Sequence, residues 1–392
     1  MQRLRQSPNQ PDFVQNPYDF YDRARAAGPF FLWEDYDTIC ATSHAAVNAI
    51  LRDRRFGRET PPGQRMPVPD HLRPFYAVED HSMLELEPPR HTRLRGLVLR
   101  AFTSRRIAAL GPEIESLTHS LIDALPDGEF DLIETFAQHL PVIIIARLLG
   151  VPETMADRLL GWSHAMVRMY IPQRSRADEE AAARAAAEFS AFLRDHIEMR
   201  RKHPADDLLT HLIAARENED RLATDEMIAT CILLLNAGHE ATVHTIGNGV
   251  KATLSEGCNP AAHSPAALAE EVLRHDPPLH LFFRHVYEPV EVMGQNLAAG
   301  SRIALLLGAA NRDPAVWQDP HRFNPARTAA PHLAFGGGLH FCVGAPLARL
   351  ELQIALPILF ARLPGLALAG PATYADSYHF HGLTALPLIA KG

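Results

Sequence analysis

The stretch 335-FGGGLHFCVGAPLARLELQIA-355 decides how this chain is interpreted, because it joins three glycines to a cysteine and then to a helix-forming run. Glycines let the backbone bend tightly before Cys342, and Gly344 keeps the next turn thin enough for a flat group to lie against it. A cysteine at a helix N-terminus lies near free backbone N–H groups and the positive end of the helix dipole, which stabilise its thiolate. The pattern therefore favours a thiolate that binds something planar, although an isolated cysteine in a glycine turn is more often a small buried apolar residue.

The spacing around this cysteine resembles a family signature. The pattern F-G-x-G-x-H-x-C-x-G is similar to the haem-ligand loop of the cytochrome P450 superfamily, and APLARLE resembles the helix that follows it in that family. The matching positions are Phe335, Gly336, Gly338, His340, Cys342 and Gly344. The resemblance implies that Cys342 is the axial ligand of the haem iron, that Phe335, Gly336 and Gly344 flank the cofactor, and that the cofactor is haem b, iron protoporphyrin IX.

Composition and charge exclude several classes of protein for this chain. The chain has 392 residues, 47% of them hydrophobic, and a net charge of −8, which allows a large core and argues against a nucleic-acid binder. The first twenty residues hold no apolar segment long enough for a signal peptide or membrane anchor, so we expect a cytoplasmic protein. The 4 cysteines form no C-x-x-C pair, which argues against disulfide frameworks and structural zinc.

Helical patterns dominate the chain. We expect helices at 112–125, 141–152 and 177–203, and strands with hairpin character at 30–42 and 290–307. From 311 to 341 the chain reads as a long ordered loop rich in Pro, Gly and Asn. One mainly α domain over 1–392 with a small β portion fits best. The resemblance implies the cytochrome P450 fold, with haem buried between the oxygen-groove helix and the cysteine-loop helix.

Three further segments precede this loop in the order that the resemblance requires, and EEVLR is one of them. Glu271 and Arg274 in EEVLR share one helix face and can form a charge pair, which alone would more often be a weak surface pair. The resemblance implies a buried structural pair that needs a third partner. Arg322 in DPHRF is the matching candidate for that partner, with Arg327 as second choice.

The segment HTRLR resembles the helix that holds the haem propionates. His91 and Arg95 lie at i and i+4, so both can approach one carboxylate. Arg284 in FFRHV and His340 complete the set that the resemblance implies. Any one of these residues, taken alone, is more often solvated surface.

The stretch LNAGHEATVH first suggests a zinc-protease helix, but His239 and His244 are five apart and do not share a helix face. It resembles instead the oxygen-binding groove of the family, in which Ala237 and Gly238 would leave space above the iron. Glu240 would be the acid that relays protons from solvent.

The chain departs from the family at the next position. Ala241 stands where the family usually has a threonine whose hydroxyl helps deliver a proton, and Thr242 follows about 100° further around the helix. We expect a substrate hydroxyl or an ordered water to supply the missing donor. The alternatives are that Ala241 lowers efficiency or that peroxide is the natural oxidant.

The resemblance implies a haem-thiolate monooxygenase that inserts one oxygen atom of O2 into a C–H or C=C bond. Only 50 residues follow Cys342, so two electrons are expected from a separate ferredoxin or flavodoxin with an NAD(P)H reductase. A basic docking patch for that acidic partner is predicted at Arg93, Arg100, Arg105, Arg106 and Arg349. A peroxide-driven or oxidative-coupling enzyme, and a haem sensor or carrier without turnover, are the rival interpretations.

The substrate is expected to be a hydrophobic organic molecule, because the segments that form pocket walls in the family are apolar and aromatic here. The candidate wall residues are Phe75, Tyr76, Met166, Met169, Tyr170, Leu234, Leu281, Phe282 and Phe380. Each could equally be ordinary core. The pair Phe282–Phe283 is expected to split, with one ring inward and one packed.

Overall fold

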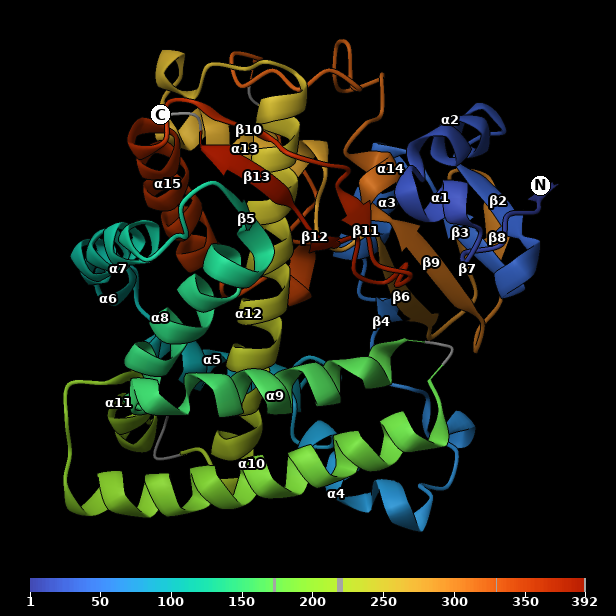
Figure 1. Cartoon of the computed structure of the whole chain (residues 1–392). Coiled ribbons are helices and arrows are strands. Elements are labelled where there is room, and N and C mark those ends of the chain that lie inside the picture. The colour runs from blue at the N-terminus through green and yellow to red at the C-terminus, as the bar shows by residue number, and fades with distance from the viewer. Residues whose placement is uncertain (172–173, 217–220, 329, 391–392) are drawn as a thin grey trace. The chain divides into compact units, whose positions relative to one another are not determined.

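The computed structural model describes residues 1–171, 174–216, 221–328 and 330–390. The described residues sort into two compact units. Unit 1 consists of Met1–Gln64, Glu115–Ala137 and Ala241–Gly392, and unit 2 consists of Arg65–Ile114 and Gln138–Glu240. Two helices, α7 (Gly111–Asp123) and α12 (Thr224–Ser255), contribute residues to both units (Figure 1). The expectation of one domain over 1–392 stays a prediction.

The main sheet of unit 1 has six strands in the order β1-β2-β3-β9-β6-β4. Their bounds are β1 Gln2–Leu4, β2 Phe30–Trp33, β3 Thr38–Ala41, β9 Arg302–Leu306, β6 Leu281–Val286 and β4 Phe56–Gly57. Strand β6 runs antiparallel to β9, and in that register Arg284 lies opposite Ile303. The hairpin predicted at 30–42 is the antiparallel pair β2 and β3.

Smaller strands and several helices complete unit 1. A second sheet has the order β10-β13-β5, and two pairs, β7 with β8 and β11 with β12, form short ribbons. These strands are β5 Glu129–Asp131, β7 Val290–Val292, β8 Gln295–Leu297, β10 Leu366–Leu368, β11 Thr373–Tyr374, β12 Leu383–Ala385 and β13 Pro387–Ala390. The helices are α1 Pro11–Gln15, α2 Tyr18–Ala26, α3 His44–Arg52, α13 Pro265–His275, α14 Leu307–Ala310 and α15 Ala345–Arg362.

Strand β6 separates two buried clusters of unit 1, because successive strand residues face opposite sides of a sheet. Phe282 packs against an aliphatic cluster that includes Leu51 and Ile303. Phe283 packs against an aromatic cluster that includes Phe31 and Trp33. The two neighbouring rings therefore lie on opposite faces of the sheet, and each is partly buried. That one of them faces a substrate stays a prediction.

Unit 2 is helical. Its helices are α4 Arg73–Glu79, α5 Arg90–Ala101, α6 Ser104–Ala109, α8 His139–Leu149, α9 Ala156–Val167, α10 Arg176–Lys202 and α11 Leu208–Ala214. The long helix predicted at 177–203 is α10, which packs against α9 (Figure 1). It begins at a capping box in which Ser175 and Asp178 satisfy each other's backbone N–H groups, and its last turn is basic. Helix α8 ends at Gly150, whose φ of 69° closes the last turn.

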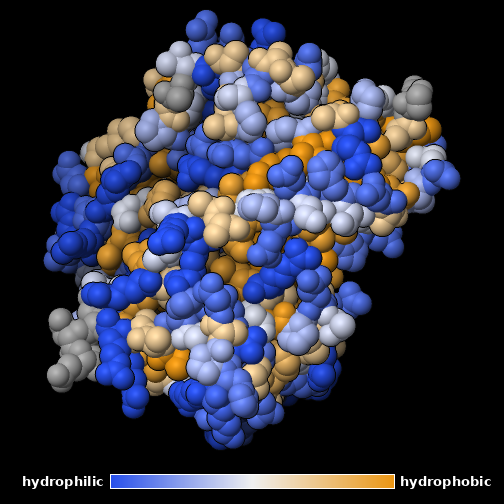
Figure 2. Space-filling model, turned by 90° about the vertical axis from the view of Figure 1, so that its left-hand side faces the viewer, coloured by the Kyte–Doolittle hydropathy of each residue, from blue (hydrophilic) through white to orange (hydrophobic). Residues whose placement is uncertain are grey.

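The predicted loop after α14 is present. Between Asn311 and Gly337 the described residues form only turns, bends and irregular backbone, and a short 3-10 helix follows at Gly338–His340. No helix among the described residues is long and apolar enough to cross a membrane. Hydrophilic and hydrophobic residues are interspersed on the face shown in Figure 2.

Candidate functional site

The glycine loop places Cys342 just before helix α15. The backbone N–H of Cys342 donates to the carbonyl of Phe335 at 3.0 Å, which closes the loop. Gly344 is the N-cap residue of α15, and a Cβ added there would lie 3.8 Å from the Cys342 Sγ. The sulfur therefore lies at the start of a helix with a glycine beside it, as predicted.

Gly338 is required by geometry. Its φ of +64° is a conformation that L side chains rarely adopt, and a Cβ there would lie 2.2 Å from the backbone oxygen of Leu51. Gly336 also has a positive φ, +68°, and a Cβ at this position would meet the ring of Phe282 at 3.4 Å. The loop therefore approaches helix α3 too closely for a side chain at Gly338, and the positive φ of Gly336 disfavours other residues there.

Cys342 differs from the other cysteines in its surroundings. Cys342 is exposed, Cys40 and Cys231 are buried, and Cys258 is intermediate. Burial raises the pKa of the Cys231 thiol to about 12 and raises that of Cys258. Among the four thiols, Cys342 is thus the one best placed to bind an external group.

The predicted charge pair is buried in unit 1. Arg274 donates from Nε and Nη2 to the two carboxylate oxygens of Glu271, each at 2.8 Å, and both side chains are at most 2% exposed. Arg274 Nη1 also donates to the carbonyls of Asn311 and Pro320. The bidentate geometry and these carbonyls satisfy both charges away from water.

The third partner of this pair is Arg327, so the expectation for Arg322 is corrected. Arg327 Nε donates to Glu271 Oε2 at 2.9 Å. Arg322 has an exposed side chain and contributes its backbone carbonyl, which accepts from Arg274 and Arg327. The reason is a turn in which the N–H of Arg327 donates to the carbonyl of Asn324 and carries the chain back toward Glu271.

The predicted propionate residues divide between the two units. In unit 1, Arg284 is 3% exposed and donates to the carbonyl of Phe283 at 2.8 Å, while His340 ends the short 3-10 helix and is partly exposed. In unit 2, His91 is 1% exposed and Arg95 is partly exposed, and both lie on α5. Each pair offers cationic or hydrogen-bonding groups suited to a carboxylate.

Glu240 is a buried carboxyl beside two histidines. Its side chain is 10% exposed, and its Oε1 lies 3.3 Å from Nε2 of His164 on α9 and 4.0 Å from Nδ1 of His239. Burial raises the pKa of Glu240 to about 7 and lowers the pKa of His164. A carboxyl with this pKa exchanges its proton near neutral pH, as a proton relay requires.

The residues beside Glu240 show why α12 has small side chains here. A Cβ at Gly238 would lie 2.8 Å from Cδ1 of Ile145, so this glycine allows close packing against α8. Ala237 is exposed. Thr242 is buried, with 4% of its surface exposed.

Sequence reasoning missed Thr245, whose hydroxyl donates to the carbonyl of Ala241 at 2.6 Å. A threonine four residues after a helical residue is a known signal for this bond.

Comparisons with known proteins agree with this reading of the motifs. The family model described as Cytochrome P450 matches residues 266–363. The chain is 38% identical to the cytochrome P450 monooxygenase PikC of Streptomyces venezuelae, over 96% of this chain and 92% of that protein. The chain belongs to the cytochrome P450 family.

Another relative and a solved structure are similar to this chain over most of its length. The mycinamicin IV hydroxylase/epoxidase of Micromonospora griseorubida is 37% identical over 89% of this chain and 88% of its own. The crystal structure of P450BioI in complex with an acyl carrier protein ligated to hexadec-9Z-enoic acid matches with a TM-score of 0.90 and 34% identity, over 97% of this chain and 99% of that chain. This cytochrome P450 therefore has the family's mainly α fold and is an oxygen-incorporating oxidoreductase with a haem-thiolate iron.

The residues of unit 1 fit such a cofactor. The exposed thiol of Cys342 is the soft ligand that haem-thiolate iron takes, and Gly344 places no side chain beside the sulfur. When bound, the haem supplies the activation of dioxygen.

The predicted substrate-wall residues lie in both units. In unit 2, Phe75 and Tyr76 contact each other edge to face, Met166 Sδ accepts from Asn236, and Tyr170 donates to Glu79. Met169 is buried and Leu234 partly buried. In unit 1, Leu281 packs in the aromatic core cluster, and Phe380 lies 6.1 Å from the ring of His244. Their contact with a substrate stays a prediction.

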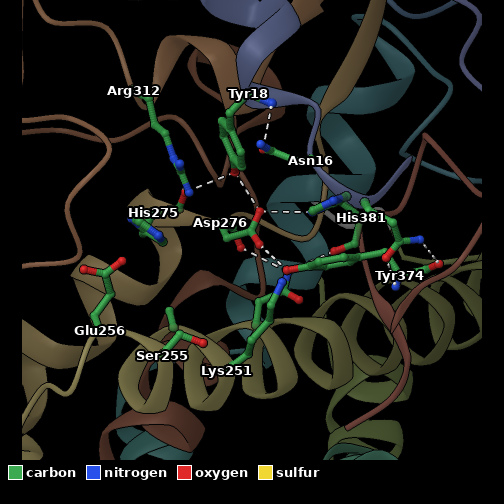
Figure 3. A pocket seen from close by; sticks show the side chains of 13 residues that line it. Asn16, Tyr18, Lys251, Ser255, Glu256, His275, Asp276, Arg312, Tyr374 and His381 are labelled. Carbon is green, nitrogen blue, oxygen red and sulfur yellow. Dashed lines mark hydrogen bonds and ion pairs between the residues drawn. The ribbon is translucent and has the colours of Figure 1, made fainter. Parts of the chain in front are cut away.

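A polar pocket of about 250 Å³ in unit 1 has none of these predicted wall residues in its lining (Figure 3). On its wall the Asp276 carboxylate accepts from Tyr18 Oη at 2.6 Å, Tyr374 Oη at 2.7 Å and His381 Nδ1 at 3.0 Å. Burial raises the pKa of Asp276, but the neighbouring histidines His381 and His280 hold it well below its usual value. This hydrogen-bonded cluster joins four parts of unit 1: the start of α2 at Tyr18, the end of α13 at Asp276, β11 at Tyr374, and the segment before β12 at His381.

Glu351 is a second acid that sequence reasoning passed over. It lies on α15, nine residues after the cysteine in sequence numbering, and is 2% exposed. Its Oε1 has no hydrogen-bond partner among the described residues, and burial raises the pKa of Glu351 to about 8. A lone carboxyl in the apolar run LELQIA was the available signal.

Proposed function

We propose that this cytochrome P450 inserts one atom of O2 into a C–H or C=C bond of a hydrophobic small organic molecule and binds haem b through Cys342. The exposure of the Cys342 thiol at the start of α15 is the observation that carries the proposal. The names of its relatives, a monooxygenase and a hydroxylase/epoxidase, support these two bond types. We further propose that residues 1–392 form a single cytochrome P450 domain, since relatives match 96% of the chain.

The remaining cofactor contacts are proposed by position. Arg284 and His340 in unit 1, and His91 and Arg95 in unit 2, would hold the haem propionates. Phe335, Gly336 and Gly344 would flank the ring, and Glu271, Arg274 and Arg327 would keep the loop in place. The motifs support these roles, and the buried ion pairs of Glu271 support the last of them.

Spectroscopy of the reduced carbon monoxide complex tests the ligand. The wild-type holoprotein should show the strongly red-shifted Soret band of a thiolate ligand, and Cys342→Ala should lose it. Cys258→Ala is the matched control, because Cys258 is partly exposed and lies outside the loop. An unchanged band in Cys342→Ala would exclude this ligand and with it the proposed chemistry.

Glu240 is proposed as the acid that passes protons from solvent into the groove. Its burial and its pKa of about 7 let it both accept and donate a proton under working conditions. Glu240→Gln should slow turnover and remove a pH dependence centred near 7. An unaltered pH–rate profile in this variant would contradict the relay.

Ala241 supports peroxide-driven oxidation as a second candidate, because the family's usual hydroxyl is absent at this position. The hydroxyl of Thr245 is already engaged, because it donates to the backbone carbonyl of Ala241. We expect Ala241→Thr to change the fraction of electrons that reach product if a water or substrate hydroxyl stands in for the threonine. Product formation with peroxide alone at the electron-fed rate would favour the second candidate.

Electrons are proposed to come from a separate ferredoxin or flavodoxin with an NAD(P)H reductase. Arg100 and Arg105 are exposed and remain candidates for the basic docking patch. Arg349 is already engaged: its guanidinium donates to Glu270 at 2.5 Å and 3.1 Å and lies over the ring of Phe335. Reversing the charges of Arg100 and Arg105 should weaken electron transfer in a salt-dependent way. The cytoplasmic location stays a prediction.

A further inference from the structure

Two helices of unit 2 bring three potential metal ligands together. His239 and Glu240 are neighbours on α12, and His164 reaches them from α9. Each residue offers one donor atom, and these atoms all lie within 4.8 Å of one another. The sequence could not show this group, because His164 is far from the other two along the chain and the helix spacing of His239 and His244 points away from a metal.

We propose that His164, His239 and Glu240 form a binding site for a divalent transition metal ion of the zinc class. Two imidazoles and one carboxylate are a donor set that zinc uses in proteins, with a fourth position left for water. Bonds of about 2.0–2.2 Å in a tetrahedral ion place donor atoms about 3.3 Å apart. His164 Nε2 and Glu240 Oε1 are 3.3 Å apart, and His239 Nδ1 is 4.0 Å from the same oxygen.

Solvent access favours such a site. The His164 side chain is 46% exposed, so an ion can enter from solvent and reach the two buried ligands.

Metal binding would affect turnover by engaging Glu240. This effect on turnover, unlike the metal site itself, rests on the proposed proton relay. A coordinated carboxylate no longer accepts or donates a proton. Zinc should therefore inhibit the reaction, with a potency that follows occupancy of the site.

Equilibrium dialysis of the chelator-treated holoprotein against Zn²⁺, followed by metal analysis, tests the site directly. We expect one tight zinc ion per chain, and at least about tenfold weaker binding in His164→Ala and in Glu240→Gln because each lacks one ligand. His211→Ala is the matched control: His211 lies 3.0 Å from Asp206 in the same unit but belongs to no three-ligand group among the described residues. It should bind zinc like the wild type.

The outcomes separate the site from the relay. Equal zinc affinity in wild type and both ligand variants would overturn the site, even where Glu240→Gln alters the pH–rate profile as the relay predicts. Loss of the tight ion in both variants, with no effect of zinc on wild-type turnover, would support the site and count against the relay. Haem absorbance and circular dichroism of each variant establish that it is folded.

Discussion

Replacing Glu351 with glutamine should make the stability of this cytochrome P450 less sensitive to pH. Burial raises the pKa of Glu351 from 4.5 to about 8 in the folded chain. When the pKa of a group is higher in the folded state, its favourable contribution to the free energy of unfolding is complete below the pKa of the unfolded state. That contribution is lost as the pH rises toward the pKa of the folded state. Between these two values the folded state holds one proton more than the unfolded state.

The size of the effect follows from this difference. Each pH unit in that window lowers the free energy of unfolding by about 1.4 kcal/mol for one proton. Raising the pH from about 5.5 to about 7 should therefore cost the wild type about 2 kcal/mol through this carboxyl alone. Glutamine has nearly the same shape and does not titrate, so any constant cost of burying its amide cancels when the two pH values are compared.

Urea unfolding of wild type and Glu351→Gln at both pH values measures the prediction. The stability of the variant relative to wild type should improve by about 2 kcal/mol at the higher pH. Glu134→Gln, which removes an exposed carboxyl of the same unit, should show no such change. An equal difference at both pH values would mean that Glu351 is solvated or already ionised in the folded protein, and the reasoning from burial would fail.

Three other substitutions should show which contacts hold unit 1 together. Arg274→Met leaves the Glu271 carboxylate buried without its bidentate partner and should lower the free energy of unfolding by about 3–5 kcal/mol in urea titrations. Gly338→Ala should destabilise the holoprotein and promote haem loss far more than Gly257→Ala, since both have positive φ but only the first would clash with backbone, and equal effects would refute the close approach. Asp276→Asn should reduce stability above about pH 4, where the low-pKa carboxylate contributes, and the difference from wild type should shrink as the pH falls through the folded pKa.

Short-range patterns gave reliable predictions because neighbouring residues determine them. The cysteine loop and the Glu271–Arg274 pair each lie within a few residues, so their spacing alone indicated their geometry. The long helix α10 was likewise predicted from its alanine content and its charged ends. Family membership followed from these local signatures and was confirmed by the comparisons.

Contacts across long stretches of chain could not be predicted in this way. The choice between Arg322 and Arg327 depends on a turn inside an irregular loop, where no periodicity specifies which side chain faces Glu271. His164 reaches Glu240 only because α9 and α12 meet. The burial of Glu351 depends on which face of α15 is covered, and its apolar neighbours on every side of the helix leave that face undefined in sequence.

The adjacent acids Glu270 and Glu271 on α13 have a consequence for how the holoprotein is assembled. Glu271 binds Arg327 of the long loop, while Glu270 binds His332 of the same loop and Arg349 of α15, and these hydrogen bonds lower its pKa to about 2 despite burial. One dipeptide therefore anchors the chain on both sides of the cysteine through contacts that contain no cofactor atom. We therefore expect the haem-free polypeptide to keep its ligand loop in shape before the cofactor binds.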